Sequence, residues 1–168
     1  QVYPHIVRIA HEILAEGLSE KVIHPGVTTT DDVVWWYRDR IVQLGLSTWI
    51  HPSVSVDRAD VPETSMSDWT LSRYDDDVIQ AGDLLHVDFG ITYLRLNTDT
   101  QQHAYVLKPE ETDVPQDLKA ALANGNRLQD ILTDNIKIGR TGNEILATSL
   151  EQAKSEGIRP SIYTHPCL

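Results

Sequence analysis

The chain has little of the chemistry that cross-links or anchors many small proteins. Its 168 residues include one cysteine, so no internal disulfide can stabilise the fold. No apolar run approaches the ~20 residues that a membrane-spanning helix requires. A phosphate-binding loop, a glycine-rich dinucleotide turn and the serine elbow of α/β-hydrolases are also missing from the sequence.

Basic residues are in the minority. The 14 Lys and Arg are outnumbered by 25 Asp and Glu, which gives a formal net charge of −11. Such an acidic surface repels nucleic-acid phosphates and anionic lipid headgroups, so we expect neither nucleic acid nor a membrane as a partner. Hydrophobic residues make up 40% of the chain and charged residues 23%, which is typical of a folded domain rather than a disordered one.

The two ends of the sequence do not resemble natural termini. The first residue is Gln1 rather than Met, and the chain stops soon after a Thr-His-Pro segment at 164–166. We therefore expect the chain to be part of a longer protein. Without the original N-terminus a signal peptide can be neither identified nor excluded, so cytoplasmic and periplasmic locations both stay open.

Hydrophobic periodicity predicts an α+β fold. Apolar residues that recur every three or four positions predict helices, and strict alternation predicts strands. Alternation is clearest around Leu85, Val87 and Phe89, and a turn near 93–95 would fold this strand into an antiparallel hairpin. The expected helices cover about 1–20, 31–44, 115–137 and 138–156, the expected strands 48–58, 84–91, 105–107 and 161–163, and the expected exposed loop 57–77.

A unit of turn, helix, glycine and strand occurs twice in the chain. Each copy starts with Gly-x-Thr, which favours a helix N-terminus, and its helix ends at another glycine. The matched positions are Gly26 with Gly139, Thr28 with Thr141, Asp31 with Glu144, and Gly45 with Gly157. Their separation is 113 residues for the first three pairs and 112 for the last. The pattern favours an internal duplication.

Two aspartates of the predicted hairpin are candidate metal ligands. Asp88 lies in a strand whose opposite face is apolar, and Asp99 follows eleven residues later. A turn between them would bring the two carboxylates close together on adjacent strands. Two ionised carboxylates side by side repel each other unless a cation lies between them. The pair therefore predicts a metal site.

Three histidines are candidates for the same region. His165 follows the last predicted strand, and the internal repeat would turn it toward the same centre. His86 shares a strand face with Asp88 and His103 shares one with Asp99, which predicts contact with substrate or support of the metal ligands. Carboxylates combined with imidazole suit Mn, Fe, Co or Zn better than Ca or Cu(I). The other histidines considered, which we interpret as ordinary surface or core residues, are His5, His11, His24 and His51.

These motifs resemble those of the methionine aminopeptidase, Xaa-Pro aminopeptidase and creatinase family. Residues 80–90 resemble its Gly-Asp-hydrophobic strand that ends in Asp-Phe-Gly, and Asp99 follows at the family's spacing. Residues 22–31 resemble its Pro-Gly-x-Thr helix start. Residues 49–54 and 163–166 are most similar to members of the Xaa-Pro aminopeptidase branch.

The resemblance implies the pita-bread fold, in which two pseudo-symmetric α+β halves enclose a dinuclear metal site. Residues 1–137 would form the first half with its connecting helix, and 138–168 the start of an incomplete second half. By position, the Asp, Asp and His ligands of the family map to Asp88, Asp99 and His165. Its two Glu ligands, one of them the general base, would fall beyond the last residue.

The function that the resemblance implies is metal-dependent hydrolysis of an N-terminal peptide bond. The substrate would be a peptide, with Xaa-Pro specificity left open, and two divalent ions such as Mn, Co, Zn or Fe would activate a water molecule. With an incomplete ligand set, we expect these 168 residues alone to hold one ion or none and to be inactive. An uncovered sheet face around Asp88 would also favour a homodimer.

Two alternatives on the same fold stay open. A protein-binding module that has lost its metal is disfavoured because three candidate ligands are present. A metal-free hydrolase of the creatinase type is disfavoured by the two aspartates. Many family members also carry a substrate-contacting His before the first Asp strand, whereas residues 71–73 contain none. Substrate contact would therefore have to come from another group.

Overall fold

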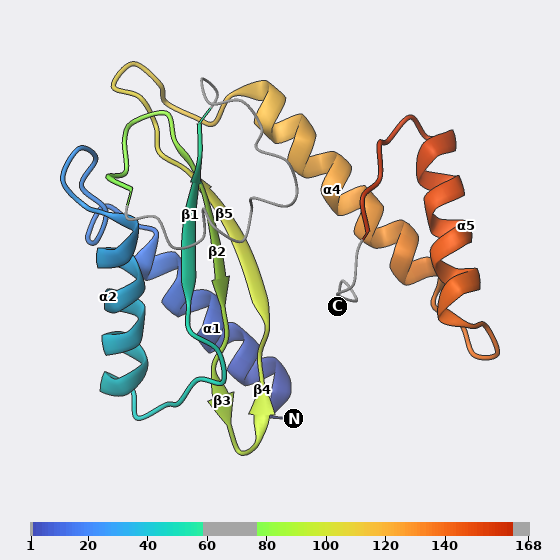
Figure 1. Ribbon diagram of the computed structural model, residues 1–168, viewed down its shortest axis with the longest axis horizontal. Coiled ribbons are helices and arrows are strands. Elements are labelled where there is room, and N and C mark those ends of the chain that lie inside the picture. The colour runs from blue at the N-terminus through green and yellow to red at the C-terminus, as the bar shows by residue number, and fades with distance from the viewer. Residues whose placement is uncertain (1, 59–76, 163–168) are drawn as a thin grey trace. The chain divides into compact units, whose positions relative to one another are not determined.

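The computed structural model describes residues 2–58 and 77–162 (Figure 1). The chain divides into two compact units, Gln1–Thr112 and Asp113–Leu168. Unit 1 contains helices α1 and α2 and an antiparallel sheet, and unit 2 contains helices α4 and α5. This mixture of helix and antiparallel strand is the α+β class that the periodicity predicts. No helix in the described part of the chain is long and apolar enough to cross a membrane.

Local sequence signals determine the two helices of unit 1. Helix α1 spans Tyr3–Gly17 and helix α2 spans Thr30–Gln43, in agreement with the prediction. At the start of α2, the Thr29 hydroxyl accepts a bond from the Asp32 backbone N–H, and the Asp32 carboxylate accepts one from the Thr29 N–H. This reciprocal capping box satisfies two backbone donors that the helix leaves unpaired. Gly45, with φ of +67°, ends α2 in the left-handed conformation.

Three antiparallel strands form the main sheet in the order β1-β2-β5. Strand β1 spans Ser53–Asp57, β2 spans Leu84–Phe89 and β5 spans Thr100–Tyr105. The prediction for β2 is confirmed. The strand predicted at 105–107 is wrong beyond Tyr105. The residues that pair with β2 are the more polar ones from Thr100 to Tyr105.

Strand β1 is also shorter than the predicted strand at 48–58. The residues before it make side-chain bonds instead of a ladder: the Trp49 indole N–H donates to the Thr98 carbonyl at 2.8 Å. The Thr48 hydroxyl donates to the Gly90 carbonyl at 2.6 Å. Most of the loop predicted at 57–77 lies outside the described residues.

One face of the sheet packs against α1 and α2, as Figure 1 shows. The alternating side chains of Leu85, Val87 and Phe89 are fully buried there. The Tyr37 ring lies 5.1 Å from that of Phe89, and its hydroxyl donates to the Leu14 carbonyl at 3.1 Å. Burial raises the pKa of Tyr37 well above its ordinary value. The opposite face of the sheet carries mainly polar side chains.

Unit 2 is a pair of helices, α4 over Gln116–Asn135 and α5 over Gly142–Ser155. The Arg127 guanidinium of α4 donates two bonds to Glu156 at the end of α5, at 2.7 and 2.8 Å. The strand predicted at 161–163 is wrong for its first two residues, which are irregular, and its third lies outside the described residues. A strand needs a partner, and no strand occurs among the described residues of unit 2.

The internal duplication can be followed in the structure. Helices α2 and α5 each contain 14 residues, begin with a capping box, and end before a glycine with positive φ. The two N-caps are Thr29 and Thr141. The two copies are therefore offset by 112 residues at every matched position from the N-cap to the final glycine. The predicted pairing of Thr28 with Thr141, and of Asp31 with Glu144, is therefore wrong by one residue. The turn that precedes α2 is one residue longer than the turn that precedes α5.

Candidate metal centre

Asp88 lies on the polar face of the sheet, near the end of the central strand β2. In the strand register it is directly opposite Ser53 on β1 and Gln101 on β5. Its side chain is half-buried, while its neighbours Val87 and Phe89 point to the apolar core. The alternation of β2 therefore fixes the face on which this carboxylate lies.

Asp99 reaches the same face through the hairpin that extends β2 and β5. Short strands β3 (Thr92–Tyr93) and β4 (Leu96–Asn97) continue this pairing beyond the main sheet. Leu94 and Arg95 both have positive φ, which is the two-residue turn geometry expected between twisted strands. The predicted turn near 93–95 is thus confirmed.

The register of this hairpin brings the two aspartates together. Ile91 and Thr98 exchange bonds, because the Thr98 N–H donates to the Ile91 carbonyl and the Ile91 N–H donates to the Thr98 hydroxyl. Asp99 lies two residues before Gln101, the residue directly opposite Asp88. It is therefore diagonally across from Asp88 on the same face. Diagonal neighbours of this kind have Cβ atoms about 7–8 Å apart or somewhat less.

A close approach at Gly90 holds the backbone that carries Asp99. A Cβ atom at Gly90 would lie 2.5 Å from the Thr98 carbonyl oxygen and 2.6 Å from the Trp49 indole nitrogen. The Thr98 side chain is fully buried and bonded to the Ile91 backbone. The residue that precedes Asp99 is therefore fixed by its own hydroxyl and by the Trp49 indole.

We expect Gly90→Ala to lower the free energy of unfolding by about 1–3 kcal/mol, because the added methyl group overlaps backbone and indole atoms that cannot both move away. The measurement is urea unfolding followed by far-UV circular dichroism. Gly125→Ala is the matched control, because nothing lies within 4 Å of its added methyl group and the site is a helix interior. That control should be neutral or stabilising by about 0.5–1 kcal/mol. Equal losses in both variants would contradict the role given to Gly90.

The donor set fits a divalent cation as far as the described residues extend. Two carboxylates on one sheet face supply hard oxygen ligands, and Asp99 is exposed, so an ion can reach it. Within residues 2–58 and 77–162, however, no three His, Cys, Asp or Glu side chains gather as a complete metal site. The third predicted ligand, His165, lies outside the described residues.

His86 and His103 form a second feature of the polar face. The two residues are directly opposite each other on β2 and β5, and their ring centroids are 5.0 Å apart. The His86 Nε2 lies 3.1 Å from the Gln101 Oε1. Burial, followed by the charge of His86, lowers the pKa of His103, and the carboxylate of Asp57 opposes this shift. The predicted sharing of one face is thus confirmed, whereas their role stays a prediction.

The sequence reasoning missed the groups that hold the start of β2. The nearly fully buried carboxylate of Asp83 accepts two bonds from the Arg58 guanidinium, at 2.9 and 3.1 Å. The Gln80 backbone N–H donates to the same carboxylate at 2.7 Å. The Gly-Asp turn before the strand was visible in the sequence, but its partner 25 residues earlier was not.

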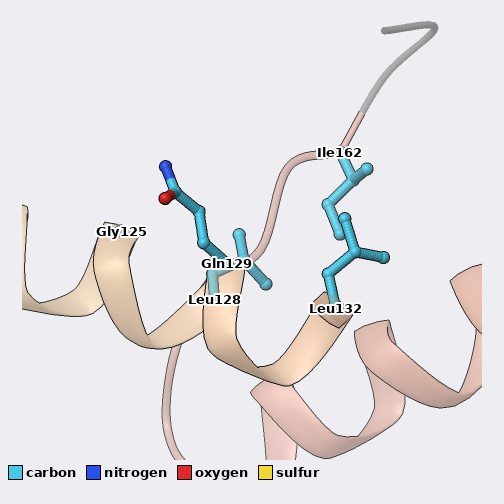
Figure 2. A pocket seen from close by; sticks show the side chains of 5 residues that line it. All are labelled: Gly125, Leu128, Gln129, Leu132 and Ile162. Atoms are coloured by element: carbon cyan, nitrogen blue, oxygen red, sulfur yellow. The ribbon is translucent and has the colours of Figure 1, made fainter. Parts of the chain in front are cut away.

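An apolar pocket of unit 2 plays no part in this chemistry. It has a volume of about 170 Å³ and is shown in Figure 2. Its lining consists of Gly125, Leu128, Gln129, Leu132 and Ile162. None of these side chains titrates, and the Gln129 amide is the one polar group among them, so the polar face of the sheet is the better candidate site.

Comparison with known proteins agrees with the fold. A model of metallopeptidase family M24 matches residues 5–167. The solved structure of the X-Pro aminopeptidase from Thermotoga maritima MSB8 is similar, with a TM-score of 0.65 and 18% sequence identity. The match covers 89% of this chain and 39% of that chain, so the present chain spans well under half of the solved structure. A search of curated protein sequences finds no significant match. The expected pita-bread fold is confirmed.

Proposed function

The chain belongs to metallopeptidase family M24, and on this premise we propose that Asp88 and Asp99 are ligands of a dinuclear metal centre that hydrolyses peptide bonds. The observation that carries the proposal is the hairpin register, which puts both carboxylates on one face at diagonal positions. Like charges so placed favour a cation between them. The substrate that we propose is a peptide cleaved at its N-terminal bond.

His165 is the third ligand that we propose. The offset of the internal repeat relates it to Ser53, which lies directly opposite Asp88 in the first copy. A residue at that place in a second copy would lie on the polar face of its own sheet, as Ser53 does in the first. The repeat thus supports the ligand assignment independently of the family's motif.

The role of the chain's own residues would be to hold and orient the metal ions. Asp88 is placed by the alternation of β2, and Asp99 by the bonds of Thr98 to Ile91 and Trp49. Divalent ions bound by these carboxylates would supply an activated water and polarise the scissile carbonyl. We assign no general base to the described residues. Mn, Co, Zn and Fe are the candidate ions, and specificity for Xaa-Pro stays a prediction.

The test is to titrate the purified 168-residue chain with Mn²⁺ in a calorimeter and to assay it with a Xaa-Pro dipeptide. With three of five expected ligands, we predict one weakly bound ion per chain and no turnover. Two tight sites, or turnover, would show that the ligand set is complete without further residues. Absence of Mn²⁺ binding would contradict the proposed metal centre. Sedimentation of the same sample tests the predicted homodimer.

A further inference from the structure

Two imidazoles face each other across β2 and β5, on the polar face of the sheet. His86 and His103 are a directly opposed pair in an antiparallel ladder, so both side chains leave the sheet on the same side. Their ring planes are inclined by 50° and their centroids are 5.0 Å apart. They come from neighbouring strands that the ladder holds rigidly (Figure 1).

This geometry matches two ligands of one ion. Imidazole nitrogens bind a transition metal at about 2.0–2.1 Å, and a tetrahedral angle between two such bonds places the ring centroids about 5 Å apart. The observed separation is 5.0 Å, which is within the range that a shared ion requires. Because strand pairing already fixes the two backbone positions, binding has only the side-chain torsions of the two rings to order.

The surroundings of His86 also favour a ligand role. The Gln101 Oε1, which can only accept, lies 3.1 Å from its Nε2, so Nε2 carries a proton and donates to it. The Nδ1 atom is then left with its lone pair. Metal-binding histidines commonly donate their second ring N–H to an amide or carboxylate oxygen in this way. Burial lowers the pKa of His103 and so favours its neutral form, which is the form that binds metals.

We propose that His86 and His103 form a two-histidine site for a borderline transition-metal ion such as Cu²⁺, Ni²⁺ or Zn²⁺, with water completing the coordination. The site is distinct from the proposed aspartate centre. His86 is two residues from Asp88 along β2, which separates their Cα atoms by roughly 6.5 Å, and His103 is four residues from Asp99. Its ligands are nitrogens rather than hard oxygens, so its metal preference differs.

The test is a titration of the chain with Cu²⁺, with electron paramagnetic resonance used to count the nitrogens bound to copper. We expect the unsubstituted chain to show a site with two imidazole nitrogens. His86→Ala or His103→Ala should weaken this site by more than about tenfold and leave at most one of the two nitrogens. His11→Ala is the matched control, because His11 is an exposed histidine on α1 and should leave the site unchanged.

A double variant, Asp88→Asn with Asp99→Asn, separates this proposal from the proposed function. It should retain the two-nitrogen copper signal although it loses the aspartate centre. Loss of the signal in that variant would assign the copper to the aspartates and overturn the proposal. Unchanged affinity in both histidine variants would overturn it too. Circular dichroism checks that each variant is folded, and Asn substitutions at both histidines repeat the test with a polar side chain.

Discussion

Asp99→Asn is expected to lower the Mn²⁺ affinity of the chain by about a hundredfold or more. The change is nearly isosteric but removes the negative charge and one strong oxygen ligand. Removal of a group that only orients a metal ligand already lowers metal affinity by about 10- to 100-fold. Removal of a direct ligand should lower it at least as much. Asp88→Asn should have an effect of similar size, because the two carboxylates lie at diagonal positions of one hairpin. Calorimetric titration of each variant with Mn²⁺ measures the change.

Asp57→Asn is the matched control for both variants. Asp57 is an exposed carboxylate on β1 of the same sheet, but it is opposite Leu84 rather than beside Asp88. The same loss of charge at this position should change the Mn²⁺ affinity little, since exposed charges are screened by salt. If all three variants lose affinity equally, the effect is that of net charge. If neither Asp88 nor Asp99 matters, the proposed metal centre is wrong.

Tyr37→Ala is expected to lower the free energy of unfolding of unit 1 by about 3–5 kcal/mol. The ring is fully buried between the helices and the sheet, in contact with Phe89. A Cβ at Gly17 would collide with the same ring, which shows how tightly it is enclosed. Truncation leaves a cavity that the capped helix and the paired strand cannot fill. Unfolding in urea should be followed by tryptophan fluorescence, because all four tryptophans precede residue 113.

Two companion variants separate the contributions of Tyr37. Tyr37→Phe removes only the hydroxyl that donates to the Leu14 carbonyl, and it should cost about 0.5–1.5 kcal/mol. Trp35→Ala, on the same helix, removes a larger side chain that is 56% exposed. This variant should change the free energy of unfolding by no more than about 0.5 kcal/mol, as substitutions at other exposed positions do. A Trp35 effect as large as that of Tyr37 would contradict the packing described for α2.

The predictable parts of the structure were those coded by neighbouring residues. Alternation around Asp88 was sufficient to assign β2 and its two faces, because period two is a local property. The capped helices and the hairpin turn were likewise readable from short segments. The motifs also pointed to the family, and the match to metallopeptidase family M24 confirms that resemblance.

The less predictable parts depended on residues far apart in the chain. The repeat pairs Thr141 with Thr29 rather than with Thr28 as predicted, since three consecutive threonines offer similar local signals. The bond from Trp49 to Thr98 joins residues 49 positions apart, and the pair of Arg58 with Asp83 joins residues 25 positions apart. No local pattern specifies such partners, because they are brought together only by tertiary packing.

The scarcity of cysteine and the excess of acid already limited what this protein could be. The sequence by itself determined that no internal disulfide stabilises the fold and that a hairpin carries two aspartates. Only the tertiary structure decided that the hairpin register sets those aspartates diagonally on one face, and that two histidines are opposed at 5.0 Å. The reason is physical. The two-residue period of a strand fixes the face on which each side chain lies, but the register is fixed only by the pairing of one strand with another.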